Sequence, residues 1–148
     1  MRHVVIAVAV GLAVGAPGAC SPPVPRSEAA PLGAVAQARR AVDTVLGQID
    51  AFKRDDFTAA YRFASSTIKQ QFDREAFERM VRGGYPEIAA PAEALVLDLG
   101  GVAAGREYVI LRVRGTSGTA VEALYELVQE DGDWKIDAVV TRPAREAI

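Results

Sequence analysis

The sequence predicts an α+β domain in which three N-terminal helices pack on a curved, four-stranded antiparallel meander. Three observations support this fold class. In the first half of the segment that begins after residue 33, apolar residues recur at three- and four-residue spacing. This spacing is typical of helices. From Glu93 onward they recur at every second position, which is typical of strands. Three turn signals then divide the second half into four strands.

The helical half begins with one long amphipathic helix at about residues 34–54, whose apolar residues form a single stripe. Side chains that can cap a helix follow it at three places. They are Asp55 or Asp56 before a second helix at 57–63, Ser65 or Ser66 before a short turn that ends near Phe72, and Asp73 before a third helix. Gly83 and Gly84 end the third helix, and Pro86 should prevent the chain from starting another.

The strand half is divided by turns at 100–105, at 115–119 and at the dipeptide Asp131-Gly132, which is a strong hairpin signal. These turns fix a register, and a slip of one residue would scatter the apolar positions between the two faces. The predicted pairs are Val113 with Val121, Leu111 with Ala123, Val109 with Tyr125, Leu127 with Ile136, and Tyr125 with Ala138. The face that bears Leu97, Leu111, Ala123 and Ile136 should therefore lie under the helices.

The N-terminus has the three parts of an export signal. Arg2 and His3 form a basic start, an uninterrupted run of apolar and small residues covers 4–14, and small residues lead to Cys20. The run is much shorter than the roughly 20 residues of a membrane-spanning helix. We therefore expect a signal peptide at 1–19, a proline-rich tether at 20–33, a single domain at 34–142 and a C-terminal tail at 143–148.

Two routes of export are open, and they differ in what happens to Cys20. Lipidation of Cys20 would anchor the protein to a membrane, and the extended tether after it fits this route. Pro17 stands where a lipoprotein signal usually has leucine, and cleavage after Gly18 would instead give a secreted protein. Both routes place the protein outside the cytoplasm, in the periplasm or on the extracytoplasmic side of a membrane. We expect no membrane contact other than through the signal or a lipid.

Composition narrows the possible chemistry of the domain. His3 and Cys20 are the only histidine and cysteine, and both precede the predicted domain. The domain therefore has neither the residues of a Ser-His or Cys-His nucleophile system nor those of an ordinary zinc or haem site. We expect no metal and no cofactor. The formal net charge of the 148 residues is −2 and no basic patch is evident, so nucleic-acid binding is not expected.

Several short segments resemble a known family. They are Gln48-Ile49-Asp50-Ala51-Phe52, Asp55-Asp56-Phe57, Tyr61-Arg62-Phe63-Ala64-Ser65, Ile68-Lys69, Met80-Val81, Gly84-Tyr85-Pro86, Leu124-Tyr125 and Trp134-Lys135-Ile136. Together they resemble the exported bacterial family named domain of unknown function 4864, over about residues 42–142. The element order resembles the wider cone fold of nuclear transport factor two and ketosteroid isomerase. The resemblance implies this fold and supplies no activity or catalytic residue.

Four aromatic side chains could line a ligand cavity between the helices and the sheet. They are Tyr61, Tyr85, Tyr125 and Trp134. The alternative is that they fill the core, with their polar ends reaching a partner or water. A binding module is favoured over an isomerase- or hydrolase-type enzyme that uses buried carboxylates, because the predicted inner face carries no carboxylate and a catalytic base must reach the pocket. We assign no catalytic residue.

Acidic residues offer two weaker candidates. The predicted register sets Glu126 opposite Asp137 on the outer face, where such a pair could hold a cation or share a proton, or could simply be solvated. Asp50, Asp55 and Asp56 also lie close together in sequence, but helix-surface and capping positions explain them better.

The outer face of the predicted sheet is partly apolar. Tyr108, Ile110, Leu124 and Val139 should gather there within a charged rim, as in an interface with a polar border. Proteins of the cone fold often dimerise through the sheet, so the resemblance also implies a homodimer. The alternative is that the C-terminal tail or the tether covers this face.

Overall fold

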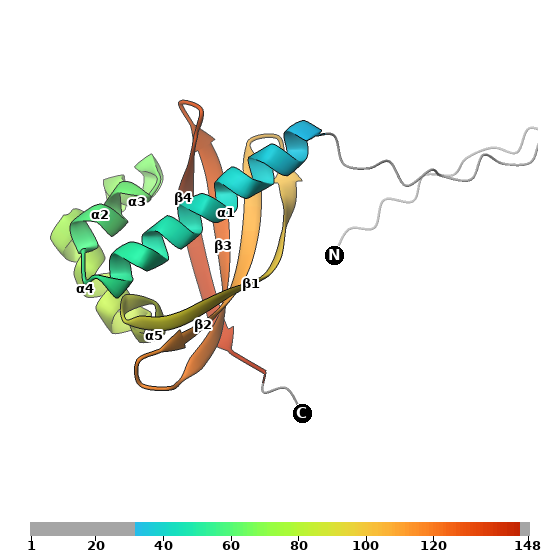
Figure 1. Ribbon diagram of the computed structural model, residues 1–148. Coiled ribbons are helices and arrows are strands. Elements are labelled where there is room, and N and C mark those ends of the chain that lie inside the picture. The colour runs from blue at the N-terminus through green and yellow to red at the C-terminus, as the bar shows by residue number, and fades with distance from the viewer. Residues whose placement is uncertain (1–31, 146–148) are drawn as a thin grey trace, which may run out of the picture.

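The computed structural model describes residues 32–145 and confirms the predicted α+β fold class (Figure 1). Within these residues helices precede strands throughout. The helices are α1 (Leu32–Lys53), α2 (Phe57–Arg62), α3 (Ser66–Gln71), α4 (Arg74–Gly84) and α5 (Pro86–Ala89). The strands are β1 (Pro91–Ala103), β2 (Arg106–Gly115), β3 (Ala120–Glu130) and β4 (Asp133–Pro143). Figure 1 shows α1 crossing one face of the sheet, with the shorter helices gathered beside it.

The helix starts follow the predicted capping residues. The Asp56 side chain accepts a hydrogen bond from the Ala59 N–H at the start of α2. Ser65 and Asp73 do the same for α3 and α4. Each cap satisfies one of the backbone donors that a helix leaves unpaired in its first turn. These local contacts set where the short helices begin.

Pro86 begins a helix, and the expectation that it would prevent one is wrong. It occupies the first position of α5, directly after Tyr85, whose φ of −138° and ψ of 58° are not helical. Proline is well suited to this position, because its φ is already helical and its missing N–H would have no partner within the helix. The predicted third helix, α4, is therefore followed by a further short helix, α5.

The sheet is a continuous antiparallel meander in the order β1-β2-β3-β4. The β2–β3 register is the predicted one, with Leu111 opposite Ala123 and Val109 opposite Tyr125. In the β3–β4 turn, Asp131 and Gly132 both have left-handed φ values, of 50° and 85°. This backbone matches the right-handed twist of the strands in a tight hairpin.

Two irregularities in the strands make the rest of the observed register differ from the predicted one. An extra residue in β4 next to Asp137 makes Tyr125 pair with Val139, not with Ala138, and brings Ala138 opposite Glu126. Another in β1 turns Val96 and Leu99 toward the helices. Leu97, expected on the inner face, is instead 43% exposed. A β-bulge of this kind exchanges the two faces for every residue beyond it.

The core lies between α1 and the inner faces of β2 and β3. Its fully buried members include Val45 and Ile49 of α1, Val109 and Leu111 of β2, and Leu127 of β3. No helix in residues 32–145 is long and apolar enough to span a membrane.

Candidate functional site: a cavity between α4 and the edge strand β4

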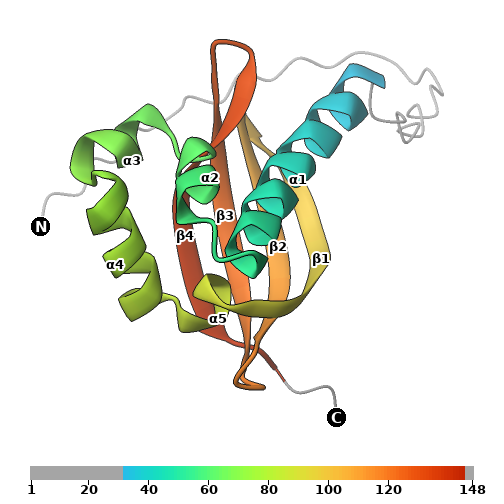
Figure 2. The same cartoon turned by 60° about the vertical axis from the view of Figure 1, so that its left-hand side comes forward.

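A cavity of about 340 Å³ opens between the short helices and the β4 side of the sheet. Figure 2 shows the arrangement that creates it, with α3 and α4 standing beside β4 while α1 lies over β1 and β2. The lining is mostly apolar. It consists of Gln48, Phe52, Ala64, Ile68, Phe72, Phe77, Met80, Val81, Gly84, Tyr85, Ile88, Tyr125, Ile136, Asp137, Ala138 and Val139. This volume and this lining fall within the range that is usual for small-molecule sites.

The chain between α2 and α3 forms one rim of the cavity by pairing with the edge of β4. The Ser65 N–H donates to the Ile136 carbonyl, and the Ile136 N–H donates to the Phe63 carbonyl, both at 2.8 Å. Ala64 and Ile136 thus form a short parallel bridge. The pairing covers part of the edge strand and fixes where α3 starts.

The bulge in β4 brings a carboxylate to the cavity wall. One Asp137 oxygen accepts a hydrogen bond from the Ser65 hydroxyl at 2.7 Å, and the other accepts one from Arg106 at 3.3 Å. The Ser65 hydroxyl in turn accepts from the Ile68 N–H. The expectation that no carboxylate reaches the inner side is therefore wrong. Asp137 is nevertheless already paired with a cation.

Tyr125 is the one lining residue whose buried polar atom has no protein partner. The side chain is fully buried, and no residue within 32–145 hydrogen-bonds its hydroxyl. Burial, together with the nearby Tyr85, raises the pKa of the Tyr125 phenol far above its ordinary value, so the phenol stays protonated. A buried hydroxyl without a partner costs roughly 1–3 kcal/mol.

The other neutral polar groups of the wall already donate hydrogen bonds to the protein. The Tyr85 hydroxyl donates to the Val139 carbonyl at 3.1 Å. The Gln48 amide donates to the Ala60 carbonyl at 3.2 Å. Tyr125 is therefore the lining residue whose O–H has no acceptor among the described residues.

The structure separates the four aromatic residues that were expected to share a pocket. Tyr85 and Tyr125 line the cavity, whereas Tyr61 and Trp134 do not. Tyr61 stands behind the wall, with its ring 5.3 Å from that of Phe77 and its hydroxyl bonded to the Phe72 carbonyl. Trp134 lies under α1, where its indole N–H donates to Gln37. Tyr61 supports the cavity, and Trp134 belongs to the core.

The outer face of the sheet carries most of the expected apolar patch. Ile110 lies opposite Leu124, and Tyr108 lies on the same face next to Glu126. The bulge turns Val139 toward the cavity, so Val140 takes its place opposite Leu124. Val140 is 61% exposed. The patch is thus Tyr108, Ile110, Leu124 and Val140.

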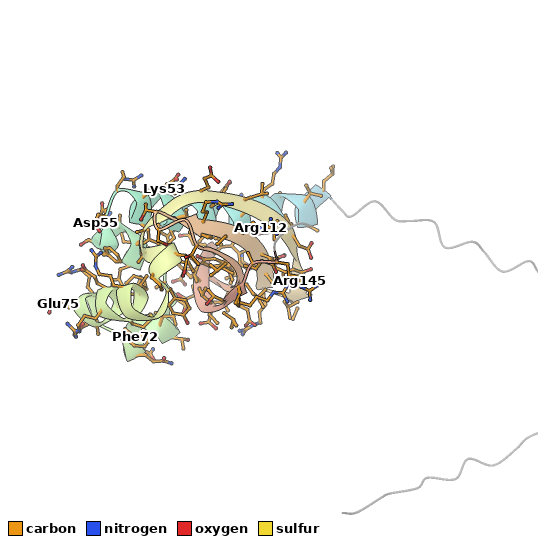
Figure 3. All side chains as sticks on the ribbon, turned by 90° about the horizontal axis from the view of Figure 1, so that it is seen from below. Lys53, Asp55, Phe72, Glu75, Arg112 and Arg145 are labelled. Carbon is orange, nitrogen blue, oxygen red and sulfur yellow. The ribbon has the colours of Figure 1, made fainter. Side chains whose placement is uncertain are left out.

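One end of this face holds a cluster of arginines around the buried carboxylate of Glu122. Arg142 donates two hydrogen bonds to Glu122, and Arg112 lies 3.8 Å from it. The bond from Arg142 lowers the pKa of Glu122. Arg112 also donates to the Arg145 carbonyl, and Figure 3 shows these two arginines near each other, well away from Phe72. The C-terminal segment is thereby held against this end of the sheet.

The remaining acidic candidates do not form a common site. Asp55 pairs with Arg82 at 2.8 Å, Asp56 caps α2, and Asp50 approaches Lys53. In the observed register Glu126 lies opposite Ala138, so Glu126 and Asp137 are not directly opposed. In the described part of the chain, no group of three or more acidic, histidine or cysteine side chains could hold a metal ion.

A second groove, of about 770 Å³, lies where the first turns of α1 pass over the ends of β1 and β2. Its lining includes Val35, Val42 and Leu99, together with the carboxylate of Glu107. Burial raises the pKa of Glu107. Cys20, the proposed signal and residues 20–31 of the predicted tether lie outside the described residues, whereas Leu32 and Gly33, which were assigned to the tether, begin α1.

Comparisons with known proteins identify the fold and a family. A family model described as "Domain of unknown function (DUF4864)" matches residues 35–148. No functionally curated protein matches the chain.

Several solved structures of similar fold are described as NTF2-like proteins of unknown function. The one from Shewanella oneidensis MR-1 has a TM-score of 0.55 at 14% identity, covering 71% of this chain and 98% of its own. The one from Silicibacter pomeroyi DSS-3 has a TM-score of 0.54 at 16% identity, covering 74% and 98%. At such identities the likeness concerns the fold alone, and this fold is the expected cone fold.

Proposed function

The chain belongs to the DUF4864 family, and we propose that it is a non-catalytic module that binds a small molecule in the cavity beside β4. The observation that carries this proposal is the Tyr125 hydroxyl, which is buried in the lining without a protein partner. Buried polar groups in folded proteins are nearly always hydrogen-bonded, so an unpaired one in a cavity wall favours a bound molecule as its partner.

The composition of the wall supports the same proposal. Phe52, Phe72 and Phe77 contribute large apolar surfaces, and Met80 adds a flexible thioether that adapts to an aromatic or aliphatic guest. A well-formed apolar pocket with few polar groups is the usual architecture of a ligand site.

An isomerase- or hydrolase-type enzyme is the second candidate, because Asp137 lines the cavity. A general base needs an oxygen free to approach the proton that it removes. Both Asp137 oxygens already accept hydrogen bonds, from Ser65 and from Arg106. Binding is therefore favoured over catalysis. We expect Asp137→Asn to keep ligand affinity within about threefold, which corresponds to roughly 0.6 kcal/mol.

The cavity can be tested with N-phenyl-1-naphthylamine, a neutral fluorophore that brightens in apolar surroundings. The purified protein should bind it with a dissociation constant on the order of 1–100 μM. Gly84→Phe should abolish this binding, because Gly84 lines the cavity and an added Cβ there meets no atom within 4 Å. Gly83→Phe is the matched control, since its Cβ is equally unobstructed and Gly83 does not line the cavity. Equal loss in both variants, or no binding by the wild type, would refute the proposal.

We also propose that the protein forms a homodimer through the outer sheet face. The apolar patch is bordered by charges of both signs, with Arg112, Glu122 and Arg142 toward one end and Glu126 and Arg106 toward the other. A two-fold axis through the patch would place the apolar residues of the two copies against each other within this charged border, as in an isologous interface.

Light scattering tests the dimer directly. Leu124→Glu should give a folded monomer, and Val140→Glu provides a second variant at a position that is 61% exposed and outside the core. Val35→Glu, on the helical side and 48% exposed, should remain dimeric. A wild-type protein that is monomeric at high concentration would rule out this interface.

Export is proposed on the N-terminal sequence. The intact mass of protein recovered from its native host distinguishes the two routes. A lipidated chain beginning at Cys20 supports a membrane-anchored lipoprotein, and a chain beginning at Ala19 with a free thiol supports secretion. Recovery of the chain with Met1 in place would contradict both.

A further inference from the structure

We propose that the cavity beside β4 selects an uncharged, flat, apolar molecule that carries a carbonyl oxygen, and that the Tyr125 hydroxyl donates a hydrogen bond to this oxygen. This inference rests on the proposed function, because it names the class of ligand for the same cavity.

The absence of a cation from the wall argues against an anionic ligand. Among residues 32–145, the lining contains no lysine, arginine or histidine. The charged group that does line the cavity is the carboxylate of Asp137, which would repel an anion. Burying a ligand carboxylate without a partner is far more costly than burying a neutral carbonyl group.

A cationic ligand is disfavoured for a different reason. Asp137 already has Arg106 as its counter-ion at 3.3 Å and the Ser65 hydroxyl at 2.7 Å. A ligand ammonium group would meet a carboxylate whose charge is already compensated, so it would gain less there than beside an unpaired carboxylate. The wall therefore offers no unpaired charge of either sign.

The unpaired polar group of the wall is a hydroxyl, which has a hydrogen bond to donate. The Tyr125 phenol remains protonated because burial raises its pKa. No residue in 32–145 accepts its hydrogen bond, and Tyr85 directs its own hydroxyl to Val139. A carbonyl oxygen on the ligand supplies the acceptor that the protein lacks, and it needs no donor in return.

The aromatic walls indicate the shape of the molecule. Phe52 and Phe77 stack at an interplanar angle of 19°, with ring centroids 6.3 Å apart. Phe72, Tyr85 and Tyr125 complete the aromatic lining, and Met80 lies among them. Flat unsaturated bodies pack well against such surfaces. A cavity of about 340 Å³ suits a bicyclic compound.

Three naphthyl probes of nearly equal shape test the inference by isothermal titration calorimetry of the whole protein. 2-Acetylnaphthalene carries the carbonyl group, 2-isopropenylnaphthalene replaces its oxygen by a methylene group, and 2-naphthoate carries a negative charge. We expect the ketone to bind about tenfold more tightly than the hydrocarbon, as one hydrogen bond to an otherwise unpaired buried donor allows. The naphthoate should bind no more tightly than the hydrocarbon.

Tyr125→Phe should remove the preference for the ketone and leave the affinity for the hydrocarbon unchanged. Tyr85→Phe is the matched control and should keep the preference, because the Tyr85 hydroxyl donates to the backbone. Should Tyr125→Phe fail to fold, the infrared carbonyl band of the ketone bound to wild-type protein decides. A hydrogen bond lowers its frequency relative to the ketone in hexane, and an unshifted band would overturn the inference.

The outcomes separate the two proposals. Equal affinity of the wild type for ketone and hydrocarbon overturns the inference and leaves a binding cavity. Tighter binding of 2-naphthoate than of the ketone also overturns it. Failure of all three probes and of the fluorophore to bind overturns the proposed function itself.

Discussion

The inner face of the sheet is covered in two different ways. Under α1, Val45 and Ile49 pack against Val109 and Leu111, and all four side chains are at most 1% exposed. Beside β4, the shorter helices leave a cavity of about 340 Å³, and one buried hydroxyl lacks a protein partner. One sheet therefore supports a close-packed core and an open site. The difference lies in the helices that cover each region.

The lengths of the helices explain the contrast. From Ala41 onward, the 22-residue helix α1 presents an apolar stripe that interdigitates with the strands, whereas its first turns line the second groove. The covering beside β4 is divided among α3, α4 and α5, which have 6, 11 and 4 residues. Each break in the helices redirects the chain, so the large side chains line a space that they do not fill.

Truncation of an isoleucine in each region should give the largest difference in stability. Ile49→Ala leaves a new void in the packed region, and we expect it to lower the free energy of unfolding by about 4 kcal/mol. Ile88→Ala enlarges a cavity that is already open, and the expected loss is about 2 kcal/mol. Urea denaturation of both variants measures the difference. Equal losses would show that the cavity wall is packed as tightly as the core.

The tyrosine hydroxyls provide the next comparison. Tyr125→Phe removes a buried hydroxyl that has no partner, so it should leave stability unchanged or raise it by up to about 2 kcal/mol. Tyr61→Phe removes the donor that bonds the Phe72 carbonyl at 2.7 Å and should lower stability by about 1 kcal/mol. Thermal and urea unfolding of both proteins test the contrast. A larger loss for Tyr125→Phe would mean that its hydroxyl has a partner within the folded protein.

Sequence patterns predicted the regions in which local chemistry determines structure. The caps at Asp56, Ser65 and Asp73 and the turn at Asp131-Gly132 depend on residues within a few positions of each other. The bulges depend instead on packing between distant elements. In β4 the run Ala138-Val139-Val140 is apolar throughout, so alternation could not show where the register changes.

The candidate site was predictable in part for the same reason. Tyr85 and Tyr125 line the cavity, whereas the bulge made the position of Asp137 unpredictable from alternation. Ser65 was identified as a possible cap, yet its contact with Asp137 spans 72 positions of sequence. Trp134 was grouped with the pocket because large aromatic residues suit both a core and a ligand site.

The Ser65 hydroxyl contacts both the start of α3 and Asp137 in the bulge of β4. Its removal therefore tests how the rim of the cavity is held together. Ser65→Ala deletes the cap of α3 and the donor to Asp137, and we expect a loss of about 2 kcal/mol. Asp73→Ala deletes the exposed cap of α4 alone and should lose about 1 kcal/mol. Urea denaturation of both variants measures the two losses. If they are equal, the contact between Ser65 and Asp137 adds no stability.

The smallest expected effect concerns the far end of the region under α1, where Glu107 lies in the second groove. Because burial raises the pKa of Glu107 above its unfolded value, the charged carboxylate opposes folding at neutral pH. This opposition should be constant above the folded pKa and should disappear as the pH falls below the unfolded pKa. Glu107→Gln should therefore be slightly more stable than the wild type at pH 7, and this advantage should vanish near pH 3.5. Glu93→Gln, at an exposed carboxylate on β1, is the control. A Glu107→Gln advantage that grows on acidification would contradict the sign of this shift and show that a cation stabilises the Glu107 carboxylate.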